Sequence, residues 1–176
     1  MSGPLVRPAV PAEFPAIARL TVAAYEAGGQ LHSAGGYADT LKDVAGRASA
    51  GELLVAVDPA TGDVVGSVVF VLPGTRFAEI SRDGEAEFRM LAVDPTAQGR
   101  GVGEALARAC VDRAAELGLG AVAICVRDFV ENAQRLYARL GFVRTPERDW
   151  SPGPGIRLLA LRLDLVTAPS VVPAAS

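Results

Sequence analysis

The sequence predicts an α/β protein with a central mixed β-sheet of six to seven strands, flanked by about four helices. Amphipathic helical segments alternate with short apolar runs rich in β-branched residues, which is typical of a sheet covered by helices. Glu52–Asp58 and Asp63–Leu72 are joined by four residues that include proline and glycine, which predicts an antiparallel hairpin. Ala121–Val126 follows a crossover helix and should pair in parallel with the strand before that helix. Antiparallel and parallel pairs together make the sheet mixed.

The length of 176 residues fits a single domain with a full hydrophobic core, which we expect over residues 1–166. The last ten residues, 167–176, are small, uncharged and contain proline, so we expect a disordered tail. A net charge of -3 gives no support to binding of nucleic acid or of an anionic membrane.

The remaining composition points to a cytoplasmic protein. No apolar run reaches membrane-spanning length, and Met1–Val10 lacks the apolar core of a signal peptide. Cys110 and Cys125 fall within apolar patterns, which predicts buried thiols rather than a disulfide framework. His32 is the only histidine and has no neighbours at metal-ligand spacing, so we expect no metal.

Near the N-terminus we expect a strand at Leu5–Pro8 and two helices, at Pro11–Ala27 and at about Tyr37–Ala48. Two interpretations of these helices are open. They form a lid that faces a substrate, or their polar aromatic residues only pad the surface of the core. The relevant side chains are Tyr25, His32 and Tyr37.

The central strand is predicted at Glu87–Val93. Phe88 and Met90 alternate on one face, and the alternation then continues in the opposite phase from Leu91. A phase change without a break is what a β-bulge produces, although a strand buried on both faces would give the same pattern. A bulge would leave backbone N–H and C=O groups free for an extended ligand.

A glycine-rich turn follows this strand and opens a helix. The turn is Gln98-Gly99-Arg100-Gly101-Val102-Gly103. Glycines allow positive φ and close approach of a ligand, and the first N–H groups of a helix attract anions, phosphate above all. Arg100 adds a positive charge. A P-loop is excluded because the only lysine is Lys42, and the third glycine comes one residue too early for a dinucleotide fingerprint.

The C-terminal third predicts a helix at Phe129–Leu140, a polar and proline-rich excursion at Arg144–Gly155, and a final strand at Ile156–Leu165. The helix carries the segment A-Q-R-L-Y-A-R-L-G-F from Ala133 to Phe142.

Two motifs together resemble the GNAT superfamily of acyl-CoA N-acyltransferases. Gln98, Gly101 and Gly103 fill its Q/R-x-x-G-x-G/A signature, and Ala133–Phe142 is similar to its A-x-x-L-Y-x-x-x-G-F segment. The resemblance covers most of the chain and implies the GNAT fold, with acetyl-CoA as co-substrate. It also implies cofactor contacts from the turn and from the backbone of the central strand. These residues are Leu91, Ala92, Val93, Gln98, Gly99, Arg100, Gly101, Val102 and Gly103.

The resemblance also assigns catalytic roles. It places the hydroxyl of Tyr137 near the cofactor sulfur, where it would protonate the departing thiolate. Glu87 is the predicted base at the start of the central strand, with Glu85 as the second candidate. The backbone N–H of Leu91 or Ala92 would polarise the thioester carbonyl. An asparagine that often contacts the cofactor is replaced by Val130, and Asn132 is the predicted substitute.

The predicted function is therefore transfer of an acetyl group from acetyl-CoA to an amine, by direct attack in a ternary complex of a monomer or homodimer. The acidic residues Glu79, Asp83, Glu85 and Glu87 favour a cationic acceptor, or else form a solvated hairpin with no substrate role. The alternative functions are a non-catalytic acyl-CoA-binding module or sensor, and a nucleotide-binding protein unrelated to coenzyme A.

Overall fold

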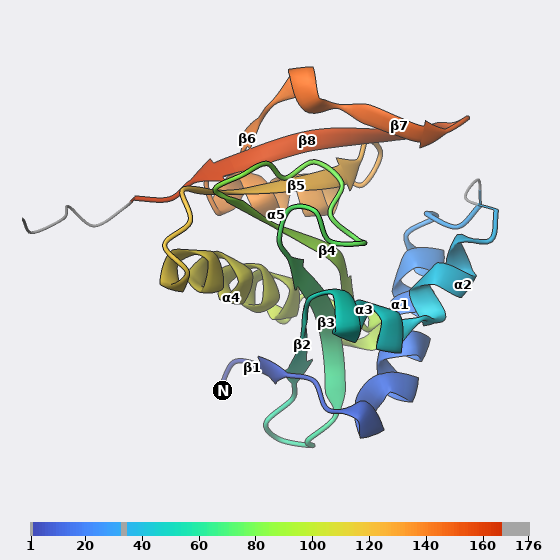
Figure 1. Ribbon diagram of the computed structural model, residues 1–176. Helices are drawn as coiled ribbons and strands as arrows, with labels where there is room; N and C mark the ends of the chain where they lie inside the picture. Colours follow the sequence, from blue (N-terminus) through green and yellow to red (C-terminus); the bar gives the residue numbers. More distant parts are fainter. Residues whose placement is uncertain (1, 33–34, 167–176) are drawn as a thin grey trace, which may run out of the picture.

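The computed structural model describes residues 2–32 and 35–166 and forms one eight-stranded sheet covered by helices on both faces (Figure 1). The strand order is β1-β2-β3-β4-β5-β8-β6, and β7 pairs with β8 beside this path. The strands are β1 (Leu5–Pro8), β2 (Glu52–Val57), β3 (Val64–Val71), β4 (Glu85–Val93), β5 (Ala121–Arg127), β6 (Val143–Arg144), β7 (Trp150–Gly153) and β8 (Ile156–Asp164). The α-helices are α1 (Phe14–Ala27), α2 (Tyr37–Lys42), α3 (Val44–Ala50), α4 (Val102–Glu116) and α5 (Glu131–Arg139).

The predicted mixed sheet is confirmed, because β4 and β5 pair in parallel and the other pairs are antiparallel. The expected counts of strands and helices were too low. The polar excursion contains the short strand β7, whose few apolar residues gave no strand pattern. The helix expected at 37–48 is two helices. It breaks at Asp43, whose side chain accepts a hydrogen bond from the N–H of Gly46 and caps α3.

Helices cover both faces of the sheet (Figure 1), and each face carries its own hydrophobic core. On one face α4 and α5 pack through Leu106, Cys110 and Tyr137. On the other face α1, α2 and α3 pack through Ile17, Leu41 and Val44. None of the helices in the described part of the chain is long and apolar enough to cross a membrane.

The predicted β-bulge in the central strand is confirmed. Between the pairs Ser67–Ala92 and Val69–Arg89, β4 uses one residue more than β3. Met90 lies in this bulge and has a φ of 53°, a left-handed conformation that a residue with a side chain rarely adopts. β4 pairs with β5 only from Glu85 to Glu87. Beyond that point, within the described residues, the edge of β4 that faces β5 has no strand partner.

A buried ion-pair cluster fixes the start of β4 to the C-terminal strands. Arg148 donates to both carboxyl oxygens of Glu85, at 3.0 and 2.8 Å, and Nε of Arg162 donates at 2.8 Å. Burial alone would raise the pKa of Glu85, but the hydrogen bonds from Arg148 and Arg162 outweigh it and lower that pKa to about 2. Glu85 is therefore a structural anion and is poorly suited to accept a proton at neutral pH.

Replacing Glu85 by glutamine should reduce the free energy of unfolding at pH 7 by about 3 kcal/mol, because two arginines lose their carboxylate. The lowered pKa makes this contribution full above about pH 4.5 and progressively lost as the pH falls toward 2. Urea unfolding at pH 7 and pH 3 measures both effects.

The matched control is Glu116→Gln, which removes an exposed pair with Arg113 and should change stability by less than about 0.5 kcal/mol. Equal effects of the two substitutions, or a Glu85 effect that does not shrink at pH 3, would contradict a stabilising role for the cluster.

Candidate active site

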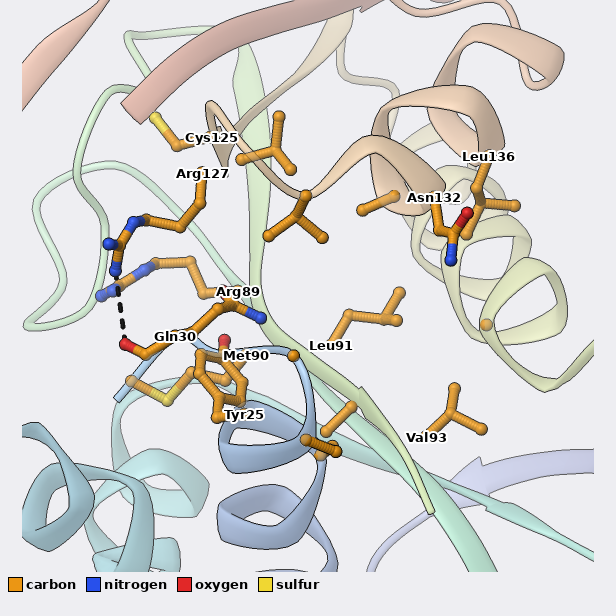
Figure 2. A pocket seen from close by; sticks show the side chains of 18 of the residues that line it. Tyr25, Gln30, Arg89, Met90, Leu91, Val93, Cys125, Arg127, Asn132 and Leu136 are labelled. Carbon is orange, nitrogen blue, oxygen red and sulfur yellow. Dashed lines mark hydrogen bonds between the residues drawn. The ribbon is translucent and has the colours of Figure 1, made fainter. Parts of the chain in front are cut away.

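A cavity of about 1140 Å³ lies where β4 and β5 separate. Its walls come from the bulged half of β4, the glycine turn, α5, the end of β5, α1 and α2, and the hairpin of β7 and β8. Figure 2 shows Leu91 and Val93 on one wall, with Asn132 and Leu136 of α5 opposite, and Arg89 and Arg127 at the far end. The cavity thus connects the start of α4 with the middle of the sheet.

Most of the cofactor-contact residues predicted from the sequence line this cavity. They are Leu91, Ala92, Val93, Gln98, Gly99, Gly101, Val102, Gly103 and Asn132, and Tyr137 lines it as well. Arg100 is not in the lining, because its guanidinium turns outward and pairs with Asp58 at 3.2 Å. The contribution of Arg100 to binding an anion is not supported by this position.

The glycine turn has the geometry that an anion site needs. Gly99 and Gly101 have φ of 76° and 77°, and Gly101 is the N-cap of α4. An L-residue at either position would be strained. The side-chain amide of Gln98 donates to the carbonyl of Val93 at 3.4 Å and links the turn to the end of β4. The N-terminus of α4, with its partial positive charge, therefore opens on the cavity.

The predicted base, Glu87, lies inside the protein rather than in the cavity lining. It is fully buried, and its Oε1 accepts hydrogen bonds from the backbone N–H groups of Glu79, Ile80 and Ser81 at 3.0 to 3.1 Å. Buried polar groups in proteins are nearly always hydrogen-bonded, and here the Glu87 side chain and the loop N–H groups satisfy each other. These hydrogen bonds hold the loop in place. The loop that it holds carries Glu79.

Of the acidic residues Glu79, Asp83, Glu85 and Glu87, Glu79 is the one that lines the cavity. Its Oε1 pairs with Nε of Arg89 at 2.7 Å, and its side chain is 15% exposed. Burial raises the pKa of Glu79 to about 7, although Arg89 lowers it in part and Glu87 adds to the rise. A carboxyl group with this pKa in a cavity is suited to general-base chemistry at neutral pH.

Sequence reasoning named Glu79 only as one of several acidic hairpin residues. It lies in an irregular loop with no periodic signal, and it reaches the cavity because Glu87 holds its backbone. The only signal in the sequence was the density of acidic residues before the central strand.

Tyr137 lies on α5 with its ring in an aromatic cluster. The centroids of Phe88 and Phe142 are 5.9 and 5.8 Å from its own. Burial raises the pKa of Tyr137, so the phenol keeps its proton over the physiological range.

Val130 is the N-cap residue of α5, and the side-chain carbonyl of the nearby Asn132 accepts a hydrogen bond from Arg135 at 2.8 Å.

The N-terminal helices border the cavity, which favours the lid interpretation over simple padding. Tyr25 of α1 and Tyr37 of α2 both line it, and their rings are 6.0 Å apart. Arg89 donates to the hydroxyl of Tyr37 at 3.3 Å and so joins this wall to β4. His32 is exposed and is not in the lining.

The sequence profile of the Acetyltransferase (GNAT) family matches residues 16–142, which is more than half of the chain. The chain belongs to the GNAT family of acetyltransferases. The matched region contains β4, the glycine turn, α4 and α5, and therefore most of the cavity wall. None of the curated proteins compared with the chain matches it significantly.

Solved structures with the same fold cover nearly the whole chain. Ribosomal-protein-S18-alanine N-acetyltransferase from Escherichia coli is 18% identical, with a TM-score of 0.69 over 96% of this chain and 98% of its own. A GCN5-related N-acetyltransferase from Kribbella flavida is 25% identical, with a TM-score of 0.64 over 93% and 98%. A putative acetyltransferase from Salmonella typhimurium, solved with its cofactor acetyl-CoA, is 22% identical, with a TM-score of 0.64 over 97% and 99%.

Proposed function

We propose that this GNAT protein transfers an acetyl group from acetyl-CoA to the amine of an acceptor, by direct attack in a ternary complex. The observation that carries the proposal is one continuous cavity, which runs from the N-terminus of α4, along the unpaired edge of β4, to Glu79 and Tyr137. Membership of an acetyltransferase family and the acetyl-CoA bound by a structural neighbour support the choice of donor.

The cavity fits the parts of such a donor. The glycine turn offers backbone N–H groups at a helix N-terminus for the pyrophosphate. Leu91, Ala92 and Val93 offer backbone groups for the amides of the pantetheine arm, in the manner of strand addition. Asn132 and two arginines of α5, Arg135 and Arg139, line the same wall and would favour an anionic ligand.

The residues at the far end supply the proton transfers. Glu79 takes a proton from the attacking amine, directly or through one water, so that the nitrogen lone pair can bond to the thioester carbonyl carbon. The N–H of Leu91 or Ala92 stabilises the charge on the carbonyl oxygen. When the carbon–sulfur bond breaks, Tyr137 gives its proton to the sulfur. We assign the role of base to Glu79, and Glu87 becomes the residue that positions it.

An acceptor screen with detection of free thiol tests the proposal. Purified protein with acetyl-CoA and a panel of primary amines should release coenzyme A only when a suitable amine is present, and mass spectrometry should find the acetylated amine. Tight binding of acetyl-CoA without thiol release in any arm would favour a non-catalytic acyl-CoA-binding module instead.

Gly103→Val should weaken binding of acetyl-CoA roughly tenfold or more, which is about 1.4 kcal/mol. A Cβ at Gly103 would already lie 3.4 Å from Leu136 and 3.6 Å from Val93, so the methyl groups of valine would narrow the cavity beside the turn. Isothermal titration calorimetry measures the Kd. Ala115→Val, at the exposed end of the same helix, is the matched control and should leave the Kd unchanged.

Glu79→Gln should lower kcat roughly 10²- to 10⁴-fold with little change in the Kd of acetyl-CoA, because the base is lost but the donor site is not. In the wild type, kcat/KM should rise with pH through about 7 as Glu79 loses its proton, and the variant should lack this limb. Steady-state rates from pH 5.5 to 9 measure it. Glu26→Gln, on the exposed side of α1, is the control. An unchanged pH profile in the Glu79 variant would rule out the assignment.

Tyr137→Phe should reduce kcat roughly 10²-fold while acetyl-CoA still binds, because only the proton donor to sulfur is removed. The ring contacts with Phe88 and Phe142 do not need the hydroxyl, so the melting temperature should stay close to that of the wild type. Thiol-release rates and thermal unfolding measure the two effects. Near-full turnover of this variant would remove Tyr137 from the mechanism.

A further inference from the structure

The acidic residues before the central strand offer an incoming acceptor little negative charge. Glu85 is bound by two arginines, and Glu87 accepts backbone N–H groups of the loop. Asp83 is exposed, and none of these three carboxyl groups lines the cavity. Glu79 does line it, at the end that also contains Arg89, and the two side chains pair. We call this end of the cavity the acceptor end.

A second ammonium group would find no further carboxylate at the acceptor end. Among the described residues, the only other acidic side chain in the lining is that of Glu104. It belongs to α4, on the side of the glycine turn, and pairs with Arg108 at 3.0 Å. Because a buried ammonium without an anionic partner is costly, the acceptor end provides for one amino group and disfavours a diamine or polyamine.

Two apolar side chains of β8 line the cavity and belong to neither hydrophobic core. Leu159 and Leu161 of this strand pack on the face of the sheet that α4 and α5 cover, so alternation directs Ile156 and Leu158 to the opposite face. Within the described residues, neither of these two joins the core that α1, α2 and α3 form on that face. Both are half-buried and line the cavity, so their apolar surface is available to a ligand.

Strand pairing places this apolar surface at the acceptor end. Leu158 lies opposite Arg127 in the ladder of β5 and β8, and Figure 2 shows Arg127 and Arg89 together at one end of the cavity. Both arginines are engaged with other groups of the protein, and Arg89 holds Glu79 and the hydroxyl of Tyr37. The carboxyl group of Glu79 and the side chain of Leu158 therefore border the same space.

Two tyrosine rings from the N-terminal helices also line this end. The ring centroids of Tyr25 and Tyr37 are 6.0 Å apart, with an angle of 55° between the ring planes. Burial raises the pKa of both phenols, so both are uncharged at neutral pH. Aromatic rings offer large apolar surfaces to a ligand. Uncharged rings and aliphatic side chains thus surround the single carboxyl group of the acceptor end.

We propose that the acceptor is a primary amine with an uncharged, apolar body, and that Ile156 and Leu158 contact this body while Glu79 receives the amino group. The inference rests on the proposed acetyl transfer and specifies its substrate class. Apolar surface that leaves water on binding stabilises the complex, and one polar group is enough to orient a ligand in such a pocket. An acceptor of this kind needs only the one carboxyl group that the acceptor end contains.

A pair of isosteric amines tests the proposal. Hexylamine and cadaverine have equal numbers of heavy atoms and differ only in the last group, which is a methyl in hexylamine and an ammonium in cadaverine. With acetyl-CoA saturating, kcat/KM per amino group should be roughly 10- to 100-fold higher for hexylamine, because the second ammonium has no partner. Norleucyl-glycinamide and lysyl-glycinamide make a similar comparison, and the pair with the higher values shows whether the apolar body belongs to a free amine or to a peptide N-terminus.

Leu158→Glu should remove or reverse the preference, because it supplies the missing carboxylate and so raises kcat/KM for cadaverine while lowering it for hexylamine. Leu158→Ala keeps the strand uncharged and should lower the value for hexylamine without raising that for cadaverine. Val143→Glu is the matched control, because it places the same carboxylate at an exposed residue of β6, which also pairs with β8, and it should preserve the preference.

The outcomes separate this inference from the function on which it rests. A wild-type kcat/KM for cadaverine that equals or exceeds that for hexylamine overturns the apolar acceptor and leaves acetyl transfer intact. A ratio of the two amines that Leu158→Glu and Leu158→Ala both leave unchanged overturns the role of Leu158. Absence of thiol release with every amine is the failure of the proposed function itself, and the inference then fails with it.

Discussion

The separation of β4 from β5 is the feature on which the rest of the site depends. The two strands pair at residues 85–87 and then diverge, while β5 continues its pairing with β8 up to Arg127. The bulge at Met90 turns the strand and leaves backbone groups without partners along one edge. Unpaired backbone groups are costly when buried, so a fold keeps them where a ligand or water can satisfy them. The cavity is the space that this divergence opens.

Buried charge then fixes the walls of that space. Glu85 clamps the paired start of β4 to the C-terminal strands through two arginines, and Glu87 gathers three backbone N–H groups of the preceding loop. Both carboxyl groups are almost fully buried. The loop so held presents Glu79 to the cavity. Two of these carboxyl groups thus hold structure, and the third lines the cavity.

Close packing of α4 on the sheet forms the end of the cavity at the glycine turn. A Cβ on Gly66 of β3 would lie 2.7 Å from a methyl of Val102 and 2.9 Å from one of Leu106, so only glycine lets α4 approach the sheet this closely. That approach puts the start of α4 and its glycine turn beside the end of β4, where a phosphate and an extended arm of one ligand can bind together. The two ends of the cavity are therefore built by different forces, packing at one and buried polar groups at the other.

The sequence by itself determined two local features: the glycine turn, from three glycines ahead of an amphipathic helix, and the parallel return of β5, from a crossover helix. It indicated the bulge through the phase change after Met90, but a strand buried on both faces would give the same pattern, and the tertiary structure decided between them. These signals are carried by neighbouring residues, so they can be read along the chain. Which carboxyl group faces the cavity, and where Arg100 and Arg127 point, was decided only in three dimensions. A charged side chain takes its role from the distant groups that desolvate or pair with it, and the order of residues does not encode those distances.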